Sequence, residues 1–338
     1  MERRPWMGPA IVYFVLAWTF ANLYYYVLPN NLVESVQVLS AFHARKPMQL
    51  RVLVPAIIHL ISSITPLSVS SIDKYLLIAS AWGILMLFAS FLALYIPKSR
   101  AWVSAPLILI PMIWNFCILT LFHYPSDLPA IVFLLGCVVL WRSNRRWAYY
   151  ACFMLACFNR ETILFILPCL FALDWSDRRL KFWMLHTALH LAIFGAVKLV
   201  LWKLFEHSPG TPVEDHLEKN LAVLLDFITL RNGAPRYFVF LFGGLHLAAL
   251  ALLRWAPREL QRLTVVTILF WAGMIYAGIL LESRIFGELI PIYTAIVIVV
   301  AARFWPTNGK QSYRMREDPN RSPRAFGPKR SSGNVISG

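Results

Sequence analysis

Long apolar runs without a charged side chain constrain the possible folds of this chain more than any other feature. Residues 9–29, 75–96 and 102–122 contain no Asp, Glu, Lys or Arg. A helix needs roughly 20 apolar residues to cross the hydrocarbon core of a bilayer, which is about 30 Å thick. A transmembrane strand would instead need about ten residues of alternating polarity, and these runs do not alternate. The sequence therefore predicts an all-α fold, a polytopic bundle of transmembrane helices.

The composition agrees with a lipid environment. The chain is 59% hydrophobic and 14% charged, whereas a soluble domain is about half apolar and about a quarter charged. Its net charge of +15 includes seven Lys or Arg in residues 307–338, a Ser-, Pro- and Gly-rich stretch without apolar periodicity. Such a segment is typical of a disordered tail near anionic lipid headgroups. We predict a transmembrane helical domain over 1–304, a disordered basic cytoplasmic tail over 305–338, membrane lipid as a partner, and no nucleic-acid partner.

The apolar runs divide into clear spans and shorter pieces. The first run is too long for a cleaved signal peptide and ends in three tyrosines, as an interfacial aromatic belt would. The clear spans are 9–28, 74–96, 101–121, 125–141, 182–205, 236–255, 264–281 and 287–304. Shorter apolar pieces cover 51–65, 147–158 and 162–173, so we expect eight to eleven membrane helices, some of them broken or re-entrant.

Charged loops predict the orientation, because cytoplasmic loops carry an excess of Lys and Arg. Four short loops are basic and 206–220 is acidic, which places 206–220 outside. The basic residues are Lys98, Arg100, Arg142, Arg145, Arg146, Arg178, Arg179, Lys181, Arg254, Arg258 and Arg262. These assignments agree only if 51–65 does not cross and 147–173 enters and leaves on one side. Both termini are then cytoplasmic, and we expect a bacterial inner membrane. The alternative makes each of the two segments a further continuous span.

Ionisable residues at membrane depth are energetically costly, so each is a hypothesis for a functional site. The loop 30–51 carries Glu34 and ends at Arg51. Apolar residues recur in it at helical spacing, which predicts an interfacial helix with Glu34 on its wet face. Alternatively, Glu34 is an ordinary solvated carboxylate and Arg51 extends its charge toward the interface.

Two further groups lie between apolar segments. Asp127 stands between two prolines at a predicted helix start, where Ser126 or Asp127 could simply cap the helix. Asn159, Arg160 and Glu161 interrupt a longer apolar segment. The backbone groups of a broken helix are tolerated only against protein or water, which favours a function. Alternatively, Arg160 and Glu161 neutralise each other.

The last group, Glu282, Arg284 and Glu288, lies between two spans on the outer side. A solvated loop, with Glu288 favourably placed at a helix N-terminus, would explain it equally well. By the predicted topology, all four groups meet at the non-cytoplasmic face. Arginines beside carboxylates suit an anionic substrate that is held by Arg while one carboxylate acts as a base. A phosphate attached to a lipid fits that description.

Metal binding has little support in the sequence. The five cysteines lie inside apolar runs without CxxC pairing, which is typical of buried apolar side chains. His186 and His190 stand four residues apart, but no Glu completes a His-Glu-x-x-His arrangement. Their spacing favours packing or interhelical hydrogen bonds. We therefore predict no cofactor and leave a divalent metal open.

From Tyr124 to Leu173 the chain resembles the GT-C superfamily of membrane glycosyltransferases, which use polyprenyl-phosphate-linked sugars. The matching parts are the helix start Ser126-Asp127-Leu128-Pro129, the basic loop Arg142–Arg146 and the motif Asn159-Arg160-Glu161-Thr162. Glu34, ahead of Arg51-Val52-Leu53-Val54-Pro55, occupies a place similar to that of the family's first-loop catalytic acid. Glu282–Pro291 also resembles a late charged motif of bacterial relatives. The chain differs in having Glu rather than Asp in the first loop, and a basic tail rather than a soluble domain.

This resemblance implies a GT-C-like transferase that moves a sugar from a lipid-phosphate-linked donor to an acceptor at the non-cytoplasmic face. Glu34 and Asp127 would be the catalytic residues, with Glu34 deprotonating the acceptor. The substrate-binding residues would be Arg51, Asn159, Arg160, Glu161, Glu282, Arg284 and Glu288. Two other functions stay open: a transporter or flippase for a lipid-linked or anionic solute, and a membrane scaffold without enzymatic activity.

Overall fold

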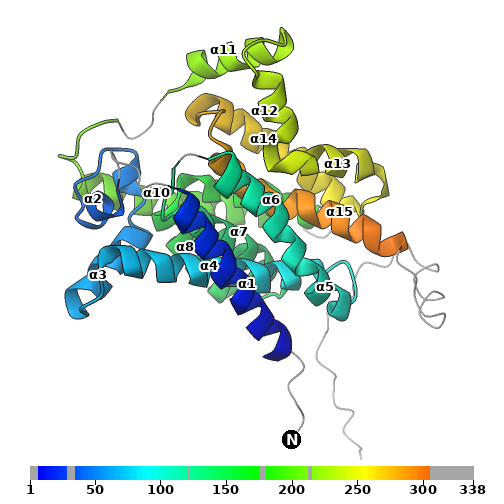
Figure 1. The fold of residues 1–338 in the computed structure, drawn as a ribbon, viewed down its shortest axis with the longest axis horizontal. Helices are drawn as coiled ribbons and strands as arrows, with labels where there is room; N and C mark the ends of the chain where they lie inside the picture. Colours follow the sequence, from blue (N-terminus) through cyan, green and yellow to red (C-terminus); the bar gives the residue numbers. More distant parts are fainter. Residues whose placement is uncertain (1–6, 29–34, 121, 176–179, 212–214, 305–338) are drawn as a thin grey trace, which may run out of the picture. The chain divides into compact units, whose positions relative to one another are not determined.

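The structure, a computed structural model, describes residues 7–28, 35–120, 122–175, 180–211 and 215–304 (Figure 1). The described chain is helical and contains no strand. Seven of its helices are long and apolar enough to cross a membrane, so the prediction of an all-α polytopic membrane protein is confirmed. They are α1 (Met7–Val27), α4 (Val69–Leu92), α5 to η3 (Lys98–Ile118), α10 (Leu180–Leu204), α12 to η6 (Ala234–Trp255), α14 (Arg258–Ala277) and η7 to α15 (Ser283–Phe304). The predicted tail lies outside the described residues.

Three of these spans are interrupted, and shorter helices lie among them. The interrupted spans contain α5 (Lys98–Ser104), α6 (Leu109–Ile113) and η3 (Trp114–Ile118), then α12 (Ala234–Phe240) and α13 (Leu245–Leu252), then η7 (Ser283–Leu289) and α15 (Ile290–Phe304). The shorter helices are α2 (Val36–Ser40), α3 (Leu53–Ile64), α7 (Asp127–Arg142), α8 (Arg146–Asn159), η4 (Glu161–Phe165), α9 (Ile166–Leu173) and α11 (Leu217–Ile228). From the sequence we expect eight to eleven membrane helices, because that number also counts α7 and the short apolar segments that form α3, α8 and α9.

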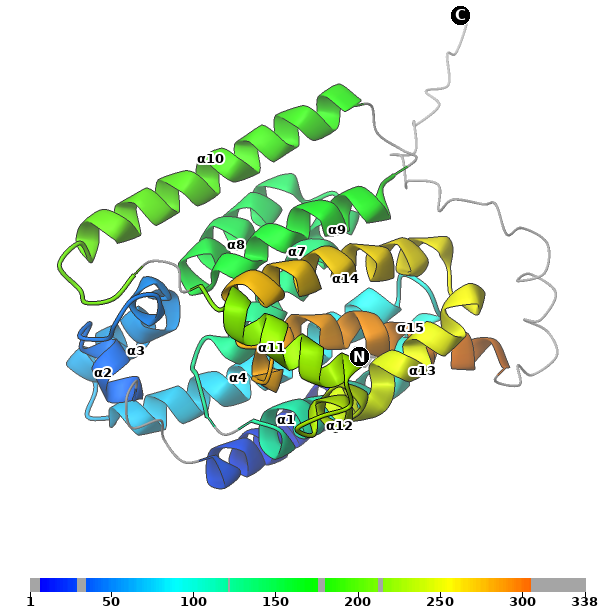
Figure 2. The same cartoon turned by 90° about the horizontal axis from the view of Figure 1, so that it is seen from above.

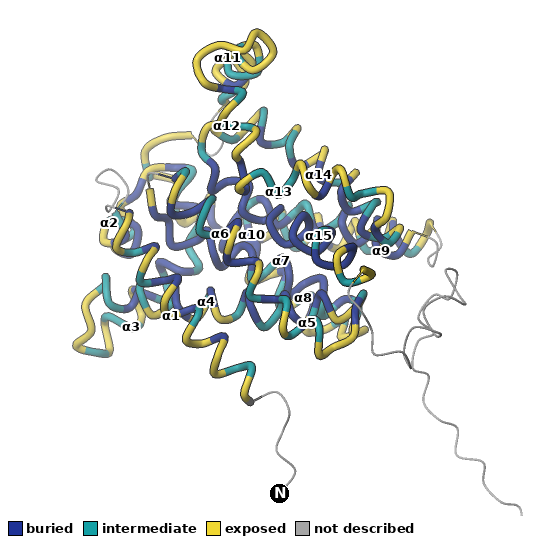
Figure 3. The backbone as a smooth tube through the Cα atoms, turned by 45° about the vertical axis from the view of Figure 1, so that its right-hand side comes forward, coloured by how far each residue is buried: buried dark blue, intermediate teal, exposed yellow. Residues whose placement is uncertain are grey.

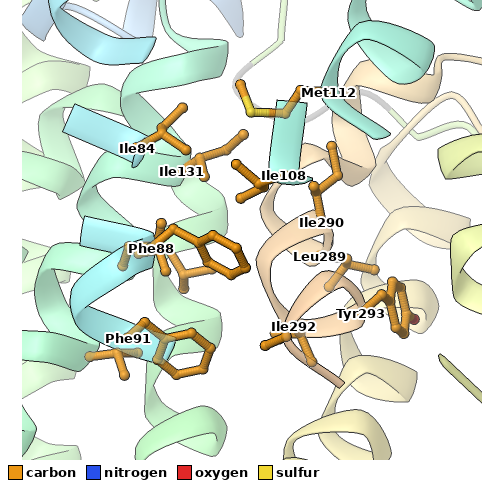
Figure 4. Packing of buried hydrophobic residues seen from close by; sticks show 14 of the residues in the cluster. Ile84, Phe88, Phe91, Ile108, Met112, Ile131, Leu289, Ile290, Ile292 and Tyr293 are labelled. Atoms are coloured by element: carbon orange, nitrogen blue, oxygen red, sulfur yellow. The ribbon is translucent and has the colours of Figure 1, made fainter. Parts of the chain in front are cut away.

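The core of the bundle is apolar and centres on α7. This helix packs against α4, α8, α9 and η7, and Figure 2 shows it in the middle of the bundle. Phe88 of α4, Ile131 of α7 and Ile290 of α15 are fully buried and pack together (Figure 4). The exposed residues lie on the periphery (Figure 3). Many are large and apolar, including Leu185 and Leu199 of α10, as expected of a surface that faces lipid.

The connecting loops gather at two ends of the bundle. At one end, the Nη1 atom of Arg142 lies 3.1 Å from Oδ1 of Asp174, and its Nη2 atom lies 3.4 Å from Oε1 of Glu259. These contacts join the end of α7 to the end of α9 and the start of α14, and we call this the basic end. At the other, the site end, Nε2 of His123 lies 2.7 Å from Oδ2 of Asp73 and joins the starts of α7 and α4. The basic loops 142–146 and 254–262, which were predicted to share a side, therefore share an end, whereas Arg178 and Arg179 lie outside the described residues.

The segment after α7 forms a re-entrant hairpin. α8 runs toward the site end, where Nη1 of Arg160 lies 3.2 Å from Oδ1 of Asp127. η4 and α9 then return to the basic end, where Asp174 pairs with Arg142. The segment thus begins and ends at the same end of the bundle. The alternative of one continuous span is wrong.

The helix α3 does not run from one end of the bundle to the other. Its 12 residues span about 18 Å at about 1.5 Å per residue, which is too short. It begins just after Arg51, whose Nε atom lies 3.3 Å from Oε2 of Glu161 at the site end. It ends shortly before α4 begins at that same end, and it packs on α2 and α4. The segment 51–65 therefore behaves as the predicted topology requires.

The helix α11 carries an exposed apolar ridge at the site end. The side chain of Asn220 donates a 2.8 Å hydrogen bond to the carbonyl of Ile275 and so fixes α11 to the end of α14. Leu221, Leu225 and Ile228 are 52%, 60% and 74% exposed. Residues at this spacing share one face of a helix. A helix that carries such an apolar face beside charged residues is typical of the membrane interface.

We therefore predict that the α11 ridge lies among lipid headgroups. A fluorophore attached at Leu225→Cys, in a cysteine-free background reconstituted into bilayers, should be quenched strongly by lipids brominated near the headgroup. The matched control is Lys219→Cys on the polar side of the same helix, where quenching should be weak. Equal quenching at the two positions would contradict this placement.

Candidate functional site

Asp127 is the centre of a buried network at the site end. It lies in the first turn of α7, and its side chain is fully buried. Its Oδ1 atom accepts hydrogen bonds from Nη1 of Arg160 at 3.2 Å and from Nη1 of Arg284 at 3.3 Å. Ser126 occupies the N-cap position, but its side chain makes no capping hydrogen bond. Capping therefore does not explain this motif, because the Asp127 carboxylate is used to pair two arginines.

The turn of the re-entrant hairpin positions Arg160. Here the backbone leaves helical geometry, with φ −160° and ψ 148° at Arg160. The preceding side chain, Asn159, donates a 3.0 Å hydrogen bond to the carbonyl of Ser126, which fixes the turn against the start of α7. Arg160 and Glu161 do not neutralise each other, as one interpretation of the sequence suggested. Arg160 turns to Asp127, whereas Glu161 turns to other cations.

Arg284 is positioned by the residue before it. The hydroxyl of Ser283 donates a 2.7 Å hydrogen bond to the carbonyl of Asn115. It also lies 3.0 Å from the hydroxyl of Thr120. Asn115 belongs to η3, a turn of π-helix, a feature often found at functional sites. Arg284 hydrogen-bonds to Asp127 and donates a 2.6 Å hydrogen bond to Glu282. Its guanidinium carbon also lies 3.9 Å from the centroid of the Tyr124 ring, a distance typical of a cation–π contact.

Glu161 links two more cations to the network. Its carboxylate oxygens lie 3.3 Å from Nε of Arg51 and 3.3 Å from Nζ of Lys198. Burial raises the pKa of this carboxyl, but Arg51 and Lys198 together lower it by more, so the net shift is downward. Glu161 is therefore ionised at neutral pH and holds the start of α3 against α10 and the hairpin.

Glu288 borders the network on its apolar side. It is buried and accepts a hydrogen bond from the hydroxyl of Thr162. The two side chains line the end of a narrow pocket between α7, α9, α14 and α15. The other residues that line it are Leu134, Phe165, Cys169, Val266, Thr267, Phe270, Leu289 and Ile292. This pocket is therefore almost entirely apolar apart from its end at Glu288.

The network balances its charges but leaves polar atoms without partners. Buried charges have to be paired, since an isolated one is strongly disfavoured. Within the described chain, Nε of Arg160, Nε of Arg284 and Oε2 of Glu288 are buried without a hydrogen-bond partner. These atoms are where an incoming polar group could bind. The four cations and four anions are Arg51, Arg160, Lys198, Arg284, Asp127, Glu161, Glu282 and Glu288.

The structure thus brings together all but one of the residues selected from the sequence. Glu34, the expected base, lies outside the described residues. Two groups were missed. Lys198 lies within the long apolar helix α10 and was not selected from the sequence. Asp73, four residues into α4, stands just before a charge-free run, so nothing in the sequence linked it to His123.

His186 and His190 belong to a different part of the bundle. Their imidazoles hydrogen-bond to Tyr150 and Tyr149 of α8, in agreement with the interhelical hydrogen bonds favoured for them. Across the described ranges, no group of three or more His, Cys, Asp or Glu is arranged to hold a metal ion. Comparisons with protein-family profiles, with curated proteins and with solved structures find no match to this chain.

Proposed function

We propose that this chain is an integral membrane glycosyltransferase that moves a sugar from a polyprenyl-phosphate-linked donor to an acceptor at the non-cytoplasmic face. One observation carries the proposal: Arg160 and Arg284, from opposite halves of the chain, converge on the buried carboxylate of Asp127. Each guanidinium keeps an Nε–H donor that no atom of the described residues accepts. Arginine donors suit phosphate oxygens, and they act most strongly where water is excluded.

The arrangement supports a single displacement at the sugar. The acceptor oxygen forms a bond to the anomeric carbon while the bond from that carbon to the phosphate oxygen breaks, with inversion. The electron pair of the broken bond passes to the lipid phosphate, and Arg160 and Arg284 stabilise the charge that develops there. Asp127 holds the two guanidinium groups together before the donor arrives, so little reorganisation is needed. The resemblance assigns the acceptor's proton to Glu34.

The apolar pocket beside Glu288 supports a lipid-linked donor. Its walls are aliphatic and aromatic side chains, including Phe165, Phe270 and Ile292, and it ends at the charged network. The pocket is small, so a hydrocarbon segment would have to widen it, and an attached phosphate would then lie near the arginines. A soluble nucleotide-sugar has no apolar part that would use such a pocket.

A transporter or flippase of the same lipid-linked solute is the second candidate. Its supporting observation is the hairpin, whose interrupted turn carries paired charges, as in transporters that bind substrate at broken helices. The two functions differ in their product: a transporter returns the donor unchanged, whereas the transferase leaves free lipid phosphate. A scaffold without activity would bind no lipid phosphate at all.

The test is Arg160→Gln in purified protein reconstituted into nanodiscs. With a panel of lipid-phosphate-linked sugars and saccharide acceptors, transfer by the variant should fall by about 100-fold or more, since a preorganised donor to a developing charge is worth that much. Polyprenyl phosphate binding, followed by native mass spectrometry, should weaken as well.

The matched control is Arg254→Gln, at an exposed arginine near the basic end, which should leave both measurements unchanged. Undiminished transfer by Arg160→Gln, with the wild type active, would remove Arg160 from the mechanism. Binding without transfer by the wild type, combined with movement of the lipid across the membrane, would favour the flippase.

A further inference from the structure

A second buried polar pair lies beside the charged network. Asp73 is in the first turns of α4, and His123 is in the segment that leads from η3 to α7. The Oδ2 atom of Asp73 lies 2.7 Å from Nε2 of His123, and the two side chains are only 2% and 3% exposed. The other ring nitrogen, Nδ1, is buried and has no hydrogen-bond partner among the described residues.

This geometry fixes which nitrogen of the ring carries the proton. A carboxylate accepts from Nε2–H, so the neutral imidazole presents a lone pair at Nδ1. A histidine held by a carboxylate in this way is the arrangement that serves as a general base in hydrolases, with the carboxylate stabilising the imidazolium that forms.

The pair lies directly behind an open groove on the surface of the bundle. The groove is open to the surroundings and is lined by Asn22, Leu23, Tyr25, Tyr26 and Lys74. The ring of Tyr25 forms the shared wall. Its centroid is 6.1 Å from that of His123 on one side and 6.0 Å from Nζ of Lys74 on the other.

The lining suggests what the groove binds. Two tyrosine rings offer apolar faces and hydroxyls, Asn22 offers an amide, and Lys74 offers an ammonium group with no carboxylate against it in the described chain. Such a combination fits a compact polyhydroxylated molecule, for instance a saccharide, better than an extended hydrocarbon chain. Tyr25 is only half-buried, and access of a groove-bound hydroxyl to Nδ1 of His123 requires that this ring rotate.

We propose that His123, oriented by Asp73, is the general base that deprotonates a saccharide acceptor bound in this groove. The inference rests on the proposed glycosyl transfer and assigns to His123 the role that the family resemblance gives to Glu34. As the acceptor oxygen bonds to the anomeric carbon, its proton moves to Nδ1 and the leaving electron pair goes to the lipid phosphate. The imidazolium then returns its proton to solvent. Asp73 does not touch the substrate and is a positioning residue.

Groups on four elements determine when His123 can accept a proton. Burial lowers its pKa and Asp73 of α4 raises it, and the net shift is upward from 6.5. Asp127 of α7 raises it further and Arg284 of η7 lowers it, while Tyr24 of α1 packs its ring against the imidazole. His123 accepts a proton only when neutral, so kcat should rise as the pH increases through a midpoint above 6.5.

The test compares kcat–pH profiles of the reconstituted protein with a lipid-linked donor and a saccharide acceptor. His123→Gln should lower kcat by about 100-fold or more and remove the rise with pH, while the KM for the donor stays unchanged. Asp73→Asn should move the midpoint to lower pH, because the carboxylate that raises the pKa is lost. A merely structural pair would lower the amount of folded protein without moving the midpoint. The control Asp226→Asn, at a carboxylate that accepts a hydrogen bond from the neutral side chain of Asn232, should match the wild type.

The outcomes separate the two proposals. If the wild type transfers sugar and His123→Gln has the same kcat and pH profile, the role proposed for the His123–Asp73 dyad is overturned. The proposed glycosyltransferase activity is then unaffected. Loss of the pH-dependent rise in Glu34→Gln but not in His123→Gln also overturns the role of the dyad. No transfer by the wild type with any lipid-linked donor overturns the glycosyltransferase and, with it, the dyad. If His123→Gln does not fold, the midpoint in Asp73→Asn is decisive: a shift to lower pH supports the proposed role of His123, and an unshifted midpoint overturns it.

Discussion

Replacing Asp127 with asparagine should lower the free energy of unfolding by about 3 kcal/mol, the size of effect seen when one partner of a buried ion pair is removed. The two arginines that share this carboxylate have side chains that are only 4% and 3% exposed, so water cannot replace it. Asparagine keeps the shape of the side chain but not its charge. The expected result is a clear fall in Tm in detergent, together with loss of sugar transfer.

Two further variants make this result specific. Asp226→Asn on α11 removes a carboxylate with an exposed hydrogen bond to Asn232 and should leave Tm nearly unchanged. Adding Arg160→Gln to Asp127→Asn should recover part of the lost stability, because one of the two uncompensated guanidinium groups is gone. If Asp127→Asn has the Tm of the wild type, the two arginines are stabilised by other carboxylates and Asp127 is not the centre of the network.

The membrane architecture could be predicted from the sequence because it follows from lengths and charges. An apolar run has to be about 20 residues long to cross, so runs of that length place the spans to within a few residues. The short piece 51–65 and the two halves of 147–173, on either side of Asn159-Arg160-Glu161, are shorter than this. Each segment begins and ends at the same end of the bundle, 51–65 at the site end and 147–173 at the basic end. The loop charges alone required this outcome.

The members of the charged network could be predicted too, but not their pairing. Charges at membrane depth have to find partners, and those identified in the sequence meet one another, apart from Glu34, which lies outside the described residues. Neighbours in sequence were poor guides to contact. Arg160 and Glu161 point to different partners, because consecutive residues at a helix end do not face each other.

The residues that were missed show the limit of this approach. Asp73 and His123 are 50 residues apart. Asp73 stands beside an apolar run, and nothing in the sequence pairs it with His123, which opens the polar segment that contains Asp127. Lys198 lies within a long apolar helix, where its position alone gives no partner. Lys198 contacts Glu161, and Asp73 contacts His123. These contacts depend on how α4, α7 and α10 pack, which the sequence does not reveal.

Gly287→Ala should be the most damaging conservative change near the site. Gly287 lies in η7 between Arg284 and Glu288, and a Cβ atom there would lie 2.5 Å from Cζ of Phe116 and 3.5 Å from Cδ1 of Ile131. Both neighbours are fully buried and cannot move aside easily. Inserting a methyl group into a packed core costs about 1–3 kcal/mol. Because η7 carries Arg284 and Glu288, transfer should fall together with Tm.

The matched control is Gly195→Ala in α10, where a Cβ atom would meet nothing within 4 Å. In a helix interior, alanine is favoured over glycine by about 0.5–1 kcal/mol, so this variant should keep or raise Tm. Adding Phe116→Leu to Gly287→Ala should recover part of the loss by making room for the methyl group. Equal Tm values for the two alanine variants would contradict the close packing of η7 against η3, and the mechanism would then need another explanation for how Arg284 is held beside Asp127. A recovery of both Tm and transfer by Phe116→Leu would instead tie the position of the arginine directly to this contact.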